Sequence, residues 1–123
     1  MTSRIDEHLA EVRARLPHRP TAGELDALIA DGALVVDIRP VELRQKDGAL
    51  PGAIVVDRNQ LEWRLDPTSA HSLAEVTDAD QRIVLVCDEG YASSLAAASL
   101  QELGLVNATD LDGGYQGWRR LNP

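Results

Sequence analysis

The chain of 123 residues carries a formal net charge of −8 and a single cysteine, Cys87. A chain of this length forms one domain with a core of its own, and its acidic charge argues against nonspecific nucleic-acid binding, which needs a basic surface. One cysteine permits no internal disulfide and no cysteine-based zinc site, which fits a reducing compartment. No apolar run approaches the length of a membrane span, and the first residues lack the apolar core of a signal peptide. We therefore expect a cytoplasmic protein that contacts no membrane.

The N-terminal residues predict an amphipathic helix over residues 5–16, ahead of the main domain. Its apolar positions recur at helical spacing and form one stripe, made of Ile5, Leu9, Val12 and Leu16. Pro17 and Pro20 end the helix. We therefore predict a helical extension over residues 1–20 and one domain over residues 21–123. The stripe packs either on the chain's own domain or against a second copy, so both a monomer and a homodimer are compatible with the sequence.

The remainder of the chain alternates between short helical and strand patterns. Thr21 and Glu24 form a capping-box pattern at the start of a helix. Apolar, β-branched runs predict strands at residues 34–38, 53–56, 83–86 and 106–111. Helical patterns cover residues 24–30, 59–65, 94–103 and 115–121. The polar stretch 70–81 is ambiguous and offers at most a helical turn. This alternation argues for an α/β fold in which a parallel sheet has helices on both faces and its ligand site at the carboxyl ends of the strands.

Cys87 stands where a buried strand passes into a helix. The run Ile83–Val86 before it is uninterrupted and apolar, and the short loop 88–93 leads into the helix 94–103. Backbone N–H groups at a helix N-terminus favour an anion, and a thiol placed there is stabilised as the thiolate, the form that attacks. A lone cysteine is often a small buried hydrophobe, but this placement favours a nucleophile.

Four segments in chain order resemble the signatures of the single-domain rhodanese family: Val35–Arg39, Gly48–Ile54, Cys87–Ser93 and Leu111–Trp118. The resemblance implies a rhodanese-like α/β fold with a central parallel sheet of about five strands and helices on both faces. It also implies a sulfurtransferase, in which the cysteine takes a sulfane sulfur from a donor such as thiosulfate as a persulfide. The sulfur then passes to cyanide, a thiol or a protein acceptor. The resemblance implies no metal and no organic cofactor.

The charge of the catalytic loop departs from the family pattern. Active rhodaneses usually carry an arginine where this chain has Ala92, and here the loop begins with Asp88 and Glu89. Negative charge next to a thiol opposes thiolate formation and repels a dianionic donor. Two charges about 6 Å apart at an effective dielectric constant near 20 interact by about 3 kcal/mol before salt screening, whereas a helix end contributes about 0.3–1 kcal/mol. The orientation of the two carboxylates therefore decides the reactivity toward thiosulfate. We hypothesise that Arg58 or Arg64 reaches over the loop and supplies the missing positive charge.

The predicted site has Cys87 as its nucleophile. The candidates for the active-site loop and for substrate binding are Asp88, Glu89, Gly90, Tyr91, Ala92, Ser93, Arg58 and Arg64. Asp37 and Arg39 either brace the loop or the substrate, or form an ion pair that closes the first strand. The expected partners are a small-molecule sulfur donor and a thiol or protein acceptor. The alternative function is a catalytically weak binding or regulatory module, which the acidic loop favours and the intact cysteine opposes. A phosphatase of the CxxxxxR type is remote, because the position six residues after the cysteine is a serine.

Overall fold

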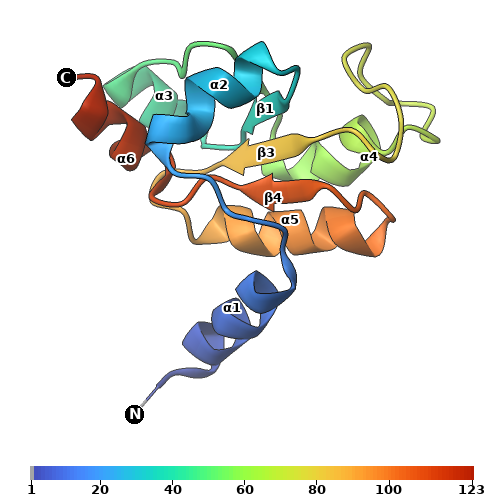
Figure 1. Cartoon of the computed structure of the whole chain (residues 1–123), viewed down its shortest axis with the longest axis horizontal. Helices are drawn as coiled ribbons and strands as arrows, with labels where there is room; N and C mark the ends of the chain where they lie inside the picture. The colour runs from blue at the N-terminus through green and yellow to red at the C-terminus, as the bar shows by residue number, and fades with distance from the viewer. Residues whose placement is uncertain (1) are drawn as a thin grey trace.

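The computed structural model describes residues 2–123 and is built on a parallel sheet (Figure 1). Its four strands are β1 (Leu34–Asp37), β2 (Ala53–Val55), β3 (Ile83–Val86) and β4 (Ala108–Asp110), in the order β2-β1-β3-β4. The expectation of about five strands was therefore too high by one for the described residues. A fifth strand would need a further apolar, β-branched run, and the polar segment 66–82 instead folds as successive turns.

Helices cover both faces of the sheet, as the alternating pattern predicts. They are α1 (Arg4–Arg15), α2 (Leu25–Ala30), α3 (Val41–Asp47), α4 (Leu61–Leu65), α5 (Ala92–Glu102) and α6 (Gly114–Leu121), with short 3₁₀ turns η1 (Ala22–Glu24) and η2 (Arg58–Gln60). Helix α3 is absent from the sequence prediction because none of its residues is buried, so the segment has no apolar stripe. None of the helices within residues 2–123 is both long and apolar enough to cross a membrane.

Two apolar clusters lie on opposite faces of the sheet because neighbouring strand residues point in opposite directions. Val36 and Leu85 pack on the face covered by α4 and α5, together with Cys87. Val35 and Val84 pack on the other face, with residues of α2 and α6. The central strand β3 is buried along its whole length, as its uninterrupted apolar sequence predicts.

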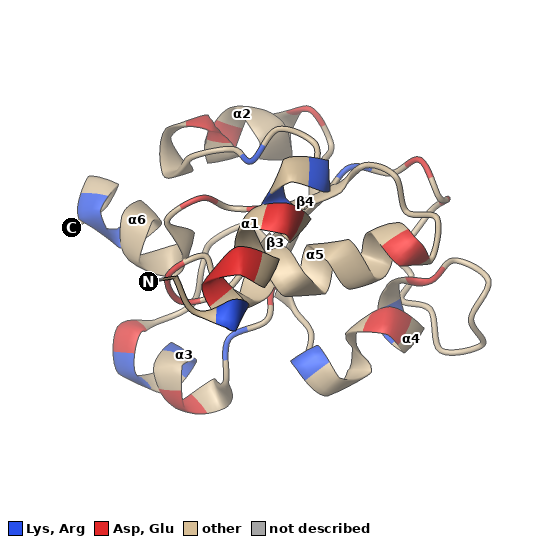
Figure 2. Cartoon of the chain, turned by 90° about the horizontal axis from the view of Figure 1, so that it is seen from below, with Lys and Arg blue, Asp and Glu red and all other residues tan. Residues whose placement is uncertain are grey.

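The N-terminal helix packs on the chain's own domain. Leu9 and Val12 are buried, whereas Ile5 is 56% exposed and lies outside the contact. Both Figure 1 and Figure 2 place α1 beside α5, and the two helices are in contact. The extended segment after α1 runs along the edge strand β4, where the Thr109 hydroxyl donates to the carbonyl of Pro17 at 3.1 Å. The extension is therefore held against the sheet at both its helix and its linker.

Candidate active site

The site lies at the carboxyl ends of β1 and β3, where the chain leaves the sheet. The loop after β3 begins at Cys87 and turns at Gly90, whose φ is +90°. It rests on the turn at Gly113 and Gly114: a Cβ on Gly114 would lie 2.7 Å from the carbonyl oxygen of Cys87. Only glycine permits this approach, and it allows the Tyr115 N–H to donate to that same carbonyl at 2.9 Å. The turn at Gly113 and Gly114 thus holds the start of the loop in place through close backbone contact.

The Cys87 sulfur lies within a ring of hydrogen-bonding groups. The N–H of Gly90 approaches Sγ to 3.1 Å and that of Ser93 to 3.4 Å, and the Ser93 hydroxyl lies 3.1 Å away. In the part of the chain that the structure describes, the N–H groups of Asp88, Glu89 and Tyr91 have no hydrogen-bond acceptor. Backbone N–H groups around a sulfur stabilise negative charge on it. The loop can therefore hold a thiolate or a sulfur anion attached to it.

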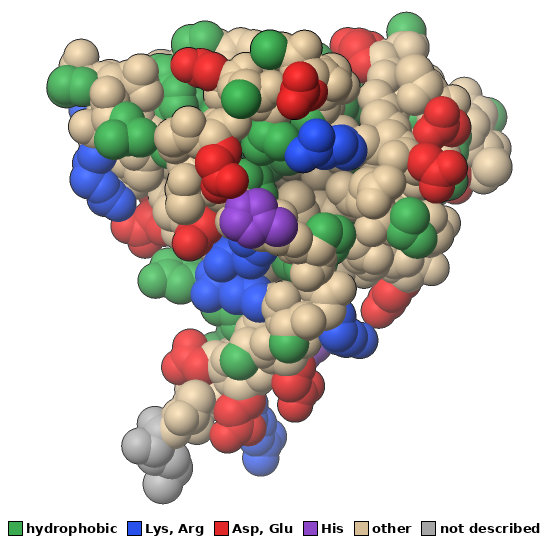
Figure 3. Space-filling model, in the orientation of Figure 1, with side chains coloured by type: hydrophobic (Ala, Val, Ile, Leu, Met, Phe, Trp, Pro, Cys, Tyr) green, Lys and Arg blue, Asp and Glu red, His purple; other side chains and the backbone are tan. Residues whose placement is uncertain are grey.

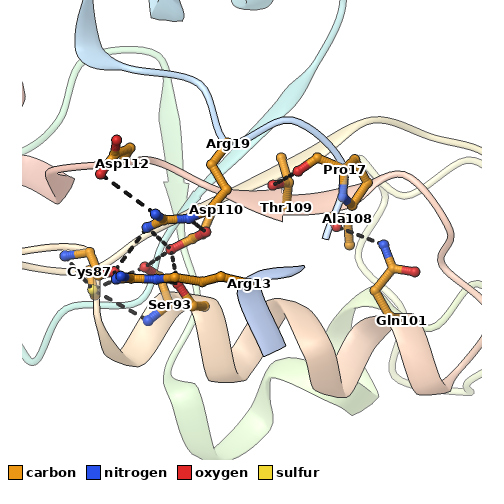
Figure 4. Close-up of polar contacts among 12 residues, drawn as sticks. Arg13, Pro17, Arg19, Cys87, Ser93, Gln101, Ala108, Thr109, Asp110 and Asp112 are labelled. Atoms are coloured by element: carbon orange, nitrogen blue, oxygen red, sulfur yellow. Dashed lines mark hydrogen bonds and ion pairs between the residues drawn. The ribbon is translucent and has the colours of Figure 1, made fainter. Parts of the chain in front are cut away.

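A buried carboxylate supports this loop from the side of β4. Asp110 is fully buried and accepts the hydroxyls of Ser93 and Ser94 at 2.7 and 2.8 Å (Figure 4). The Arg19 guanidinium completes its shell, with Nε 2.7 Å from Oδ1 and one terminal nitrogen 3.2 Å from Oδ2. Burial acts to lower the pKa of Arg19, but its hydrogen bond and charge interaction with Asp110 outweigh burial and raise that pKa. The guanidinium of Arg19 therefore stays charged, and the contacts of Asp110 with Ser93 and Ser94 fix the first turn of α5 beneath the sulfur.

Sequence reasoning missed the contribution of Arg13, Arg19 and Asp110 to the site. For Asp110 and Arg19 no local pattern places the two residues together, since 91 residues separate them. For Arg13 a signal exists: it stands four residues after the buried Leu9 and so lies on the inner face of α1. A charged side chain on a buried face needs a partner, and Arg13 finds it in the loop that follows Cys87.

Cys87 opens onto a cavity of about 370 Å³. The other lining residues are Ile38, Arg39, Pro40, Arg58, Asp88, Glu89, Tyr91 and Ala92. The structure thus brings the predicted loop residues and Arg58 together around the sulfur. Gly90 and Ser93 lie beneath, with direct contacts to Sγ. The cavity is large enough for a small organic molecule.

The two hypothesised arginines differ in position. Arg58 stands in the wall of the cavity, although its charge is shared with Glu62 in an ion pair of 3.0 Å. Arg64 lines a separate hollow with Trp63, where its guanidinium donates to the carbonyl of His71 at 3.0 Å. Of the two, only Arg58 is placed to meet a molecule bound next to the cysteine.

Asp37 and Arg39 form a buried ion pair at the end of β1. Their side chains approach to 2.7 Å, and the same guanidinium donates to the carbonyl of Gly48 at 2.9 Å and stacks over the Tyr115 ring at 3.7 Å. Nη1 of Arg39 is buried without a hydrogen-bond partner in the described residues. The pair joins β1 to α6 and to the segment before β2.

The two acidic side chains of the loop are oriented differently. The Asp88 carboxylate is half-buried and accepts the amide of Gln116 at 2.9 Å, whereas Glu89 is exposed. Exposure screens the charge of Glu89 by solvent and salt. The hydrogen bond to Gln116 partly compensates that of Asp88. The electrostatic penalty on the cysteine is therefore smaller than two inward-facing carboxylates would impose.

Comparison with known proteins agrees with this geometry. The family model of the rhodanese-like domain matches residues 21–121. Thiosulfate sulfurtransferase GlpE of Pseudomonas fluorescens is 33% identical over 100 residues, covering 81% of this chain and 83% of that protein. The same enzyme of Pseudomonas entomophila is 35% identical, covering 79% of this chain and 80% of that protein.

Solved structures give the same fold. The human single-domain sulfurtransferase TSTD1 superposes with a TM-score of 0.69 at 27% identity, covering 83% of this chain and 95% of that one. A protein of unknown function from Rhodopseudomonas palustris, described as a possible tyrosine phosphatase, gives a TM-score of 0.85 at 30% identity. That match covers 99% of this chain and 93% of the other, so it includes the N-terminal helix, which lies outside the family model.

Proposed function

Because this chain belongs to the rhodanese-like domain family, we propose that it is a sulfurtransferase that carries sulfane sulfur as a persulfide on Cys87. The observation that carries the proposal is the position of the sulfur. It lies at the edge of a cavity, within hydrogen-bonding distance of two backbone N–H groups, in a loop whose Asp88, Glu89 and Tyr91 N–H groups have no acceptor among residues 2–123. This arrangement suits a sulfur that is negatively charged before and after it accepts a second sulfur atom.

The reaction proceeds in two displacements. The Cys87 thiolate attacks the outer sulfur of the donor, a new S–S bond forms, and the bond between that sulfur and the rest of the donor breaks. The leaving group departs with the electron pair, as sulfite when the donor is thiosulfate. In the second step an acceptor thiolate or cyanide attacks the outer sulfur of the persulfide, and the Cys87 thiolate leaves. The N–H groups of the loop stabilise the anion in both states, so no cofactor takes part in the proposed mechanism.

The charge around the cavity favours a donor other than free thiosulfate. A dianion in the cavity meets Asp88 and Glu89, and the two arginines of the cavity wall are already paired, Arg58 with Glu62 and Arg39 with Asp37. The cavity also exceeds the size of thiosulfate, and Ile38, Pro40, Tyr91 and Ala92 contribute apolar wall. We propose an organic donor with at most one negative charge, such as mercaptopyruvate or a low-molecular-weight persulfide.

Intact-mass spectrometry of the reduced protein tests the proposal. The protein is exposed to thiosulfate, mercaptopyruvate or a low-molecular-weight persulfide, with Cys87→Ser as control. We expect the wild type alone to gain one sulfur atom, with the organic donors faster than thiosulfate, and cyanide or a thiol to remove it. No adduct from any donor would contradict the proposal and favour a binding module, which would keep its partner after Cys87→Ser.

Hydrolysis of phosphate esters has less support in this site. Phosphatases with a cysteine in an anion loop bind the phosphate through an arginine six residues after the cysteine, and Ser93 occupies that position here. Its hydroxyl is directed to Asp110. We expect no release of phosphate from an aryl phosphate under conditions in which the persulfide forms.

A further inference from the structure

The N-terminal segment reaches the catalytic loop through two arginines. Arg13 from α1 and Arg19 from the following linker both donate to the carbonyl oxygen of Gly90, at 2.6 and 3.1 Å. Figure 4 shows the two guanidinium groups side by side and directed toward the loop that begins at Cys87. In the space-filling view, Lys or Arg side chains gather where the N-terminal helix meets the rest of the molecule (Figure 3). Residues 1–20 lie outside the part of the chain that the family model matches.

The carbonyl that these arginines hold belongs to the residue with the most freedom in the loop. Gly90 has a φ of +90° and donates its own N–H to the Cys87 sulfur at 3.1 Å. Glycine has no side chain that restricts its backbone, so contacts with its neighbours determine its orientation. In a trans peptide the carbonyl and the next N–H point in opposite directions. Holding the Gly90 oxygen on the arginine side therefore turns the Tyr91 N–H to the other side.

The arginines also bring positive charge to a loop that has none of its own. The charged groups around the sulfur are Asp88 and Glu89 of the loop, Arg39 with Asp37 at the end of β1, Arg58 with Glu62, Asp110 of β4, and Arg13 and Arg19. The charge of Arg19 is balanced by Asp110. No carboxylate lies within ion-pair distance of Arg13 in the described part of the chain; its partners are Gly90, Ser94 and the Tyr91 ring.

We infer that Arg13 and Arg19 are positioning residues for Cys87: both fix the Gly90 carbonyl, and Arg13 supplies, from outside the loop, the positive charge that the loop lacks at Ala92. The N-terminal segment is then a functional part of the active site. This inference rests on the proposed role of Cys87 as a nucleophile. It assigns the loop's electrostatic support to α1 and its linker, where the sequence alone suggested the segment after β2.

Alkylation of Cys87 by iodoacetamide as a function of pH tests the inference without any sulfur donor. The variants are Arg13→Ala, Arg13→Lys and Arg19→Lys, and Arg15→Ala is the matched control, because Arg15 is exposed on the same helix. We expect Arg13→Ala to move the midpoint of the profile upward by about one pH unit, which slows alkylation by about tenfold at pH values well below the midpoint. Arg13→Lys keeps the charge but not both hydrogen bonds, so we expect its midpoint to lie between those of the wild type and Arg13→Ala.

Arg19→Lys keeps a charge beside Asp110 but cannot reach Asp110 and Gly90 together as the forked guanidinium does. We expect the limiting alkylation rate at high pH to be higher in this variant than in the wild type, because the loop is held less firmly. Circular dichroism and the melting temperature verify that each variant is folded. If Arg13→Ala does not fold, the profile of Arg13→Lys tests the inference in its place.

Profiles of the Arg13 and Arg19 variants that coincide with those of the wild type and Arg15→Ala would overturn the inference. A shifted midpoint in a protein that forms no persulfide with any donor would support the inference while contradicting the proposed function. If the Arg13 and Arg19 variants keep the wild-type profile while the wild-type protein forms the persulfide, the proposed function is supported and the inference is contradicted. The two hypotheses therefore fail separately.

Discussion

Replacing Asp110 by asparagine tests whether the buried ion pair stabilises the loop and the extension together. Asp110→Asn removes the charge but keeps the size and one carbonyl oxygen of the side chain. The Asp110 side chain is 0% exposed and that of Arg19 is 16% exposed, so the change leaves a largely buried guanidinium without its carboxylate. Breaking a buried pair in this way costs about 3–5 kcal/mol.

The expected loss lies at the lower end of that range. Asp112 lies 3.6 Å from Arg19 and can take over part of the interaction, and asparagine still accepts a hydrogen bond from Ser93 or Ser94. We therefore expect the free energy of unfolding to fall by about 3 kcal/mol, and the melting temperature to fall by roughly 10 °C.

Urea denaturation, followed by circular dichroism, measures the difference. Asp112→Asn is the matched control: it removes a carboxylate from the same arginine, but its side chain is 57% exposed. Exposed pairs contribute about 0–1 kcal/mol. An Asp110→Asn protein as stable as Asp112→Asn would refute the reasoning, because the buried pair would then contribute no more than an exposed one.

Three further results are expected. Gly114→Ala should lower both the stability of the protein and the reactivity of the cysteine, because the new Cβ displaces the loop backbone. Gly104→Ala is the control: its φ is +88° but no atom lies within 4 Å of the new Cβ, so we expect it to affect stability only. Melting curves and alkylation rates distinguish the two variants. Burial acts to raise the pKa of Glu62, but its hydrogen bonds and the charge of Arg58 lower it, so its contribution to stability is present above its ordinary pKa and is lost as the pH falls through the lowered value. The difference in urea midpoint between wild type and Glu62→Gln should accordingly be largest at neutral pH and shrink toward pH 3. Arg58→Ala should raise the KM for an anionic donor by roughly fivefold, as expected for a partly exposed charge, while Arg64→Ala should match the wild type in the same steady-state assay; equal effects would remove Arg58 from the binding site.

The acidic loop illustrates why charge counted along the sequence is a poor guide to a site. Asp88 and Glu89 are adjacent to the cysteine in sequence, yet one carboxylate is exposed and the other accepts a hydrogen bond. The guanidinium groups that contact the loop belong to Arg13 and Arg19, which lie 77 and 71 residues before Gly90 in the chain. Electrostatic interactions depend on distance and burial, and tertiary packing sets both.

Much of the fold follows from local properties of the sequence. The apolar run Ile83–Val86 predicts a central buried strand, and the structure has β3 at those residues. The capping box of Thr21 and Glu24 is present, and the Thr21 N–H donates to the Glu24 carboxylate at 2.7 Å. Helix α3 could not be predicted in this way, because none of its residues is buried and an apolar stripe is the principal signal of a helix in a sequence.

The sequence by itself determined the alternation of strands and helices and the place of Cys87 at a strand end, because each depends on neighbours a few residues apart. Only the tertiary structure decided which charged side chains surround the sulfur. Arg58 lines the cavity and Arg64 does not, although both follow β2. Arg13 reaches Gly90 across 77 residues of chain. Such contacts are set by the packing of α1 against α5 and of its linker along β4, and no local pattern records them.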